Sequence, residues 1–317
     1  MKKKILSLLI LVSIGIATII GISAYYWFFT DNVNDDDDDN GTSNISRNMI
    51  IDHNCAHLAD LNSIPVSWIN AAKNNLHISY WHTSHGSQLI DGMTPLDDFM
   101  NNPDIYEFNS DGSDGALHIH EEGEDLTDST NDFDDITRDF LNLNPQYNII
   151  MWSWCGLNKD GTLINQYLNN MNQLESEYPN KFFVYMTAHL EGTGVEGALN
   201  TCNEIIRNYC KTNNKILYDF ADIESYNPDN VNFLVQYGTD NCTYDGNSNG
   251  YIDNEDINRY NWAIEWQNSH SEAPYPNGGD WYSCSCAHSQ SLNGNMKAYA
   301  AWYLFARIAG WNASEIE

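Results

Sequence analysis

The chain carries little positive charge. Its 317 residues include 14 lysines and arginines against 44 aspartates and glutamates, which gives a formal net charge of −30 at pH 7. A surface this acidic repels phosphate, so a nucleic acid is not an expected partner. The sequence also has no internal repeat and no CxxC or CxxCH motif. These absences exclude a repeat architecture, a thioredoxin-type redox motif and a c-type haem attachment motif.

Seven cysteines are present, and all of them follow the apolar N-terminal segment described below. In an external compartment this number predicts disulfides with one thiol left over. Cys202 and Cys210 are more than two turns apart on one expected helix, too far to bridge each other. Sequons for N-glycosylation, which fit an external surface, begin at Asn40, Asn44, Asn241 and Asn312.

Two N-terminal segments precede the expected globule. Residues 1–30 combine lysines at positions 2–4 with the uncharged apolar stretch Ile5–Phe29, long enough to cross a bilayer core of about 30 Å. This predicts a membrane anchor that leaves the remainder of the chain on the extracellular side. A signal peptide cleaved near Ser23-Ala24 is the alternative. Residues 31–47 contain a run of consecutive aspartates and are expected to be a disordered, solvated linker.

Residues 48–317 alternate apolar, β-rich runs with helical patterns, and they are numerous enough for one sizeable core. Strands are predicted at 76–81, 148–154, 181–188 and 215–221. Helices are predicted from an N-cap at Ser63 to 75, and at about 86–93, 131–143, 163–177, 195–213 and 293–309. Strands that are apolar throughout are typical of parallel sheets covered on both faces. We therefore expect one α/β domain, a three-layer, doubly wound, flavodoxin-like parallel sheet, with an insertion at about 238–268.

Polar side chains follow several of these strands. Sheets of this kind bind ligands at the carboxyl ends of their strands. The sequence HTS ends the first strand at Ser84, directly before a helix, where a serine can be presented as a nucleophile. His288, in the loop before the last helix, is the expected base. After the second strand, Gly156 lets the backbone approach a substrate closely, and the side-chain amide of Asn158 is an expected donor for a developing oxyanion.

The order of these motifs resembles that of the SGNH, or GDSL-like, hydrolases. HTS stands where that family has GDS, Gly156-Leu157-Asn158 matches its G-x-N block, and His288 matches the histidine of its D-x-x-H block. The resemblance implies serine esterase activity, with Asn158, the Ser84 amide and a glycine amide around the oxyanion. Gly112 or Gly115 is the nearest match to that glycine, and would need an extra strand near 105–108.

The sequence departs from the family pattern in two of its motifs. His82-Thr83 replace Gly-Asp before the nucleophile, and Ser285 stands where the last block has its aspartate. Asp280 is the nearest alternative acid; without it the site would operate as a dyad of serine and histidine.

Other assignments of these residues are open. Ser84 could serve only as a helix N-cap, and Ser87 is a rival nucleophile. Cys155 is a weaker one, because no base adjoins it in the sequence. A disulfide between Cys155 and Cys286 would tie two loops of the site together. Histidines expected either to orient substrate or to pack are His82, His85 and His189.

The segment DGNSNGYIDNED, residues 245–256, fits the twelve-residue EF-hand loop. Oxygen ligands for Ca²⁺ would come from the side chains of Asp245, Asn247, Asn249, Asp253 and Asp256 and from the carbonyl of Tyr251. The final aspartate resembles the loops of dockerin modules, but those modules have two loops and this chain has one. We therefore expect a structural Ca²⁺ and no cohesin partner; an Asn/Asp-rich turn without metal is the alternative.

These observations support two hypotheses. The first is a membrane-anchored extracellular serine esterase acting on acyl esters of carbohydrate or of other envelope components. The second is a non-catalytic, calcium-stabilised surface protein that binds such components on the same fold. The departures at His82-Thr83 and Ser285 favour the second.

Overall fold

The computed structural model describes residues 48–129, 132–157 and 161–313. The predicted N-terminal anchor and acidic linker, and Asn158, lie outside these ranges. Within them, no helix combines the length and the apolar character needed to cross a membrane.

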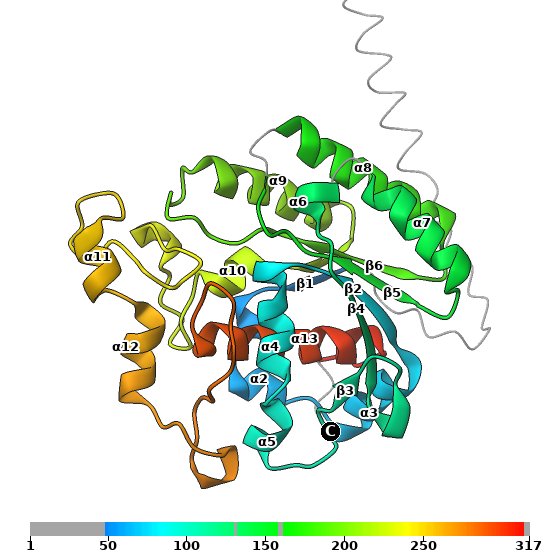
Figure 1. Ribbon diagram of the computed structural model, residues 1–317, viewed down its shortest axis with the longest axis horizontal. Helices are drawn as coiled ribbons and strands as arrows, with labels where there is room; N and C mark the ends of the chain where they lie inside the picture. Colours follow the sequence, from blue (N-terminus) through cyan, green and yellow to red (C-terminus); the bar gives the residue numbers. More distant parts are fainter. Residues whose placement is uncertain (1–47, 130–131, 158–160, 314–317) are drawn as a thin grey trace, which may run out of the picture. The chain divides into compact units, whose positions relative to one another are not determined.

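A parallel sheet forms the centre of the described part of the chain, in the order β1-β7-β6-β5-β2-β4-β3 (Figure 1). The strands are β1 (Met49–Ile51), β2 (His77–Trp81), β3 (Phe108–Asn109), β4 (Leu117–Glu122), β5 (Ile149–Trp152), β6 (Phe182–Met186) and β7 (Ile216–Tyr218). The chain passes from β2 to β4 on one side and then returns to β5 on the other. This reversal marks the topological switch point of a doubly wound sheet, where ligand sites form at the carboxyl ends of the strands.

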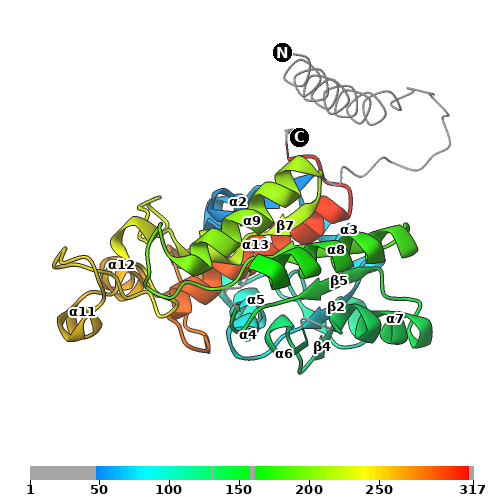
Figure 2. The ribbon, with the colours of Figure 1, turned by 90° about the horizontal axis from the view of Figure 1, so that it is seen from above.

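Helices cover both faces of the sheet (Figures 1 and 2). One face carries α7 (Phe133–Leu143), α8 (Gly161–Glu177) and α9 (Ala198–Thr212). The other carries α2 (Leu58–Asn62), α3 (Val66–Asn75), α4 (Ser87–Met93), α5 (Leu96–Met100) and α13 (Ser291–Ile308). Most residues of α13 are buried, and this helix packs beside α4. The fold is therefore the expected three-layer α/β architecture.

The four predicted strands are confirmed as β2, β5, β6 and β7, and each is shorter than predicted. The prediction missed β1, which has three residues, and β4, which reads LHIHEE and so lacks an apolar run. The extra strand expected near 105–108 corresponds to β3, but the strand beside β2 is β4. Ser63 is not the N-cap of α3: it ends α2, and Pro65 caps α3.

The segment between α10 (Phe220–Glu224) and α13 adds no strand to the sheet. It contains α11 (Asn254–Arg259) and α12 (Trp262–Ser269), which lie to one side of the sheet (Figure 1). The calcium-type loop lies at the start of α11, inside the region expected to be an insertion.

Candidate functional site

Ser84 begins a tight turn at the carboxyl end of β2. It is the first residue of a short 3₁₀ helix, Ser84–Gly86, and its φ of 22° is sterically unusual for a residue with a side chain. Glycine is required at position 86 because the backbone passes close to neighbouring side chains: a Cβ there would lie 2.3 Å from Ser153 Oγ and 2.6 Å from His82 Cβ. The turn is thereby held against the end of β5, and the Ser84 side chain is exposed.

Ser84 and His288 meet across the edge of the sheet. The Ser84 Oγ atom lies 2.7 Å from His288 Nε2, although 204 positions separate the two residues in sequence. Both residues are exposed. Ser87, the rival nucleophile, instead donates its hydroxyl to the Ser84 carbonyl at 2.8 Å and faces Asp91 Oδ2 at 3.1 Å. His288 therefore pairs with Ser84 and not with Ser87.

A buried polar cluster holds the loop that carries His288. Gln88 Nε2 donates to the Ala287 carbonyl at 2.5 Å, and Asn293 Nδ2 donates to Ser289 Oγ at 2.6 Å. The residues on both sides of His288 are thus fixed. Behind them, the fully buried Lys297 and Glu224 form an ion pair of 2.6 Å. The only signal of this cluster in the sequence was a lysine within the apolar stretch of the last helix.

Asp280 does not supply the acid of the site. It is exposed, and its carboxylate accepts a hydrogen bond from the Ser271 amide at 2.9 Å. Among the hydrogen bonds of the described residues, none joins a carboxylate to His288. Ser84 and His288 therefore form a dyad in this part of the chain.

The residues expected to surround an oxyanion are described only in part. The Gly156 amide donates to Thr127 Oγ1 at 2.7 Å and is therefore engaged, while Asn158 lies outside the described residues. Gly112 and Gly115 precede β4, so they lie toward the opposite edge of the sheet. The glycine that follows β4 is Gly123, which is exposed and whose Cβ, if present, would meet no atom within 4 Å.

The turn is also tied to the end of β4. The hydroxyl of Thr83 donates to Oδ2 of Asp125, whose other carboxylate oxygen accepts from the Thr127 amide at 2.7 Å. Asp125 is 1% exposed. The contact with this buried carboxylate gives Thr83 a structural role beside the serine.

The three histidines expected to orient substrate or to pack have different surroundings. His82 Nε2 lies 3.0 Å from Glu121 Oε2, so His82 is engaged with β4. His85 lies between two other imidazoles, with ring centroids 3.9 Å from His189 and 4.4 Å from His288. His189 Nδ1 donates to the Leu190 carbonyl at 2.6 Å.

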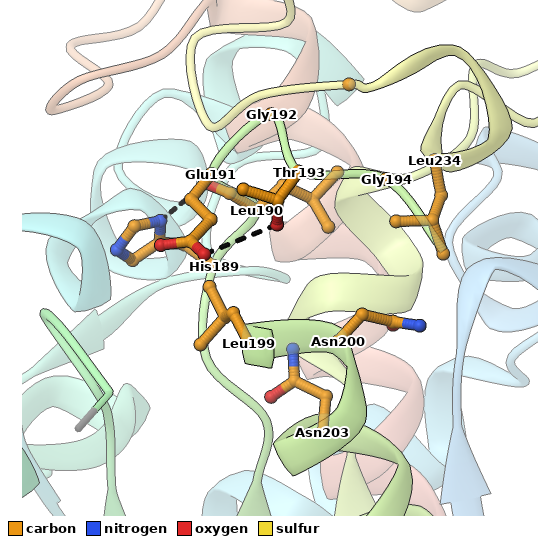
Figure 3. Close-up of a pocket in the computed structure, with 11 residues that line it drawn as sticks. His189, Leu190, Glu191, Gly192, Thr193, Gly194, Leu199, Asn200, Asn203 and Leu234 are labelled. Atoms are coloured by element: carbon orange, nitrogen blue, oxygen red, sulfur yellow. Dashed lines mark hydrogen bonds between the residues drawn. The ribbon is translucent and has the colours of Figure 1, made fainter. Parts of the chain in front are cut away.

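His189 also borders a small cavity with Glu191, Thr193 and Asn203 (Figure 3). The cavity has a volume of about 10 Å³, which is room for about one water molecule. It adjoins the site but is too small to hold an acyl group.

His85 Nε2 lies 3.0 Å from Asp240 Oδ2. Burial acts to raise the pKa of Asp240, but the hydrogen bond with His85 and the charges of His189 and His85 outweigh it and hold this pKa below its usual value. The ligand atoms of His85, His189 and Asp240 lie within 4.8 Å of one another. The two rings are stacked, with an angle of 7° between their planes. Because a metal lies near the plane of the imidazole that binds it, one ion would not fit both rings.

The expected disulfides are not formed: none of the cysteines takes part in a disulfide bond. Cys155 Sγ lies 3.4 Å from His85 Nδ1. Cys286 instead faces α13, where a Cβ on Gly294 would lie 3.2 Å from its sulfur atom. The two cysteines thus have different neighbours, and the suggested Cys155–Cys286 pair is absent.

The loop 245–256 is closed by hydrogen bonds between its own oxygen-bearing residues. Asp245 accepts from the Asn249 and Gly250 amides at 3.0 Å and 2.7 Å, and Asp253 accepts from Asn249 Nδ2 at 2.8 Å. Asp256 is fully buried and accepts from the Gly246 amide at 3.1 Å. Gly250 has a φ of 95°, so the sharp turn needs glycine at this position. Hydrogen bonds within the loop therefore bring together the residues at its first, fifth, ninth and twelfth positions, which are Asp245, Asn249, Asp253 and Asp256.

The fold and the site define an α/β protein with an exposed serine–histidine dyad at the carboxyl edge of a doubly wound sheet. No family model, curated protein or solved structure matches this chain. What the protein does must therefore be inferred from the geometry of the site.

Proposed function

We propose that this protein is a serine hydrolase of the SGNH type that cleaves ester bonds. The observation that carries the proposal is the 2.7 Å separation of Ser84 Oγ and His288 Nε2. A hydroxyl on a strained turn with an imidazole at hydrogen-bond distance is the basic arrangement of an activated serine. The order of strands around β2 and the position of His288 before the last helix fit the same class.

The dyad accounts for both halves of an acyl transfer. His288 accepts the Ser84 proton as Ser84 Oγ attacks the ester carbonyl, and then gives it to the departing alcohol. The Ser84 amide, as the first of its 3₁₀ turn, has no acceptor within that turn. We assign it to the oxyanion, together with the Gly123 amide and the side chain of Asn158. Water then attacks the acyl-enzyme with His288 as base.

The proposed substrates are acyl esters on carbohydrate or on another envelope polymer. Because Ser84 and His288 are both exposed, the dyad can reach an acyl group that projects from a large substrate. The apolar stretch at 5–29 and the acidic segment at 31–47 of the sequence support a location outside the cell, attached to the membrane.

Covalent labelling tests this proposal directly. A fluorophosphonate is expected to add once to the full-length protein, because an activated serine displaces its fluoride. Peptide fragmentation should place the label on Ser84. The variant Ser84→Ala should take up no label, and Ser285→Ala, which removes an exposed serine near His288, should label at the wild-type rate.

Two outcomes would count against the proposal: a label on Ser87 in place of Ser84, or no label on folded wild-type protein. The second outcome would favour the non-catalytic surface protein on the same fold.

We also propose that residues 245–256 bind one structural Ca²⁺. Carboxylate and amide oxygens are the ligands that this hard cation prefers. Five oxygen-bearing side chains occupy the expected positions, at Asp245, Asn247, Asn249, Asp253 and Asp256. Their closure around one loop, with Gly250 at the turn, supports this assignment.

Ca²⁺ is expected to raise the midpoint of thermal unfolding, and EDTA to reverse the rise. Binding to the folded state alone stabilises it by about 2.7 kcal/mol at 100 times Kd. Asp245→Ala should abolish the shift, because it removes the first ligand. The matched control is Asp139→Ala, which replaces an exposed aspartate on α7 and should keep the calcium-dependent shift. An unchanged calcium-dependent shift in Asp245→Ala would contradict the assignment.

A further inference from the structure

A second set of nucleophile, base and acid lies beside the dyad. Cys155 follows β5, and its Sγ lies 3.4 Å from His85 Nδ1. The other ring nitrogen, Nε2, lies 3.0 Å from Asp240 Oδ2. The imidazole thus faces a thiol on one edge and a carboxylate on the other. In this arrangement a histidine can take a proton from a thiol while the carboxylate holds the ring in place.

The ring of His85 has little freedom to turn. His85 is 8% exposed, and its faces are covered by His189 and His288, at centroid distances of 3.9 Å and 4.4 Å. Asp240 fixes the edge that carries Nε2, so Nδ1 is directed at Cys155. The group is therefore oriented before any substrate arrives, which is the condition for efficient proton transfer.

In five other cysteines of the chain, burial favours the protonated thiol. Burial raises the pKa of Cys55 to about 12 and that of Cys286 to about 11. It also raises the pKa values of Cys210, Cys242 and Cys284. Cys155 is partly exposed, as are Cys55, Cys284 and Cys286, but its sulfur lies 3.4 Å from a histidine nitrogen. Its surroundings are those of a reactive thiol rather than of a packed one.

We propose that Cys155 is a second nucleophile of this site, with His85 as its base and Asp240 as the residue that positions His85. Its substrates would be small activated acyl donors, such as reactive esters and thioesters. The Cys155 proton passes to His85 Nδ1 as the sulfur bonds to the acyl carbon. The departing alcohol or thiol takes that proton as the carbonyl reforms, and a thioester remains on Cys155. Water then cleaves the thioester, returning the acid product and the free thiol.

The test uses the full-length Ser84→Ala protein, so that the serine contributes nothing. With p-nitrophenyl acetate, one p-nitrophenolate per chain should be released in a burst. The acetyl group should map to Cys155 and be removed by neutral hydroxylamine, as expected of a thioester. Adding Cys155→Ala should abolish the burst, whereas adding Cys286→Ala should leave it unchanged.

Further variants separate the base from a structural role. His85→Ala is expected to slow acetylation about 10²-fold, the lower end of the effect of a general base, and added imidazole should restore part of the rate. Asp240→Asn should slow acetylation without a response to imidazole, because the ring is present but misoriented.

Acetylation of another cysteine, or equal rates with and without His85, would overturn the proposal. Because every variant lacks Ser84, such a failure would leave the fluorophosphonate result at Ser84 unaffected. A failure of fluorophosphonate labelling would likewise leave the result at Cys155 unaffected.

Discussion

Replacing Ser84 with alanine is expected to lower steady-state kcat/KM for p-nitrophenyl acetate by about 10³-fold, within the usual range for loss of general-base-assisted attack. His288→Ala should have a loss of similar size. The reason is the 2.7 Å contact between Ser84 Oγ and His288 Nε2: a serine without its base, or a base without its serine, performs neither half of the reaction.

The double variant Ser84→Ala/His288→Ala distinguishes a dyad from two independent residues. Residues that act as a unit are strongly non-additive, so the double variant should be no slower than either single variant. Ser285→Ala is the control and should keep wild-type turnover. If the double variant instead showed the product of the two single reductions in kcat/KM, His288 would not act through Ser84.

Replacing Lys297 with methionine is expected to lower the free energy of unfolding by about 3–5 kcal/mol. Lys297 and Glu224 are both 0% exposed and lie 2.6 Å apart. Removing the ammonium leaves a carboxylate buried without its charge partner, which is one of the largest penalties that a single substitution can cause. Lys297 Nζ also lies 3.6 Å from the centre of the Phe220 ring, so a cation–π contact would be lost as well.

Denaturant unfolding of matched variants measures this effect. In Lys297→Met/Glu224→Gln both charges are removed, and much of the lost stability should return. Lys211→Met, an exposed lysine at the end of α9, should change stability by no more than about 0.5 kcal/mol. A Lys297→Met protein as stable as the Lys211→Met control would refute the assigned role of the pair.

Loss of Lys297 should also reduce turnover by the serine, because the buried cluster holds the loop of His288. Lys297 Nζ donates to Gln88 Oε1, and Gln88 in turn donates to the Ala287 carbonyl. Glu224 accepts from the Leu190 amide at 2.6 Å, which fixes the residue after His189. One ion pair thus links the two loops that meet at the site.

Apolar runs were sufficient to predict the central strands. The runs at 148–154 and 181–188 became β5 and β6 because strands buried on both faces must be apolar at every position. β4 was missed for the converse reason: it contains His118, His120 and two glutamates. With β4 unplaced, the sequence pointed to Gly112 and Gly115, although the glycine that follows this strand is Gly123.

Which polar groups pair with one another was harder to predict than where the elements lie. Asp280 was the nearest alternative acid along the chain, with a dyad as the other possibility, yet its carboxylate binds the Ser271 amide. Cys155 was a weak nucleophile candidate because no base adjoins it in sequence, yet the packing of His85 places its Nδ1 atom 3.4 Å from the Cys155 sulfur. Local sequence gives no information on either pairing, because each depends on how loops from different strands meet.

The sequence by itself determined the α/β class, the central strands, the turn at Ser84 and the twelve-residue loop, because each rests on local periodicity or on spacing within one segment. Tertiary structure alone decided that His288 reaches Ser84, that no cysteine forms a disulfide, that Lys297 and Glu224 meet in the core, and that Cys155, His85 and Asp240 form one group. The physical reason is that the doubly wound sheet collects the carboxyl ends of distant strands at one edge, so the partners of a side chain there come from loops far away in the sequence.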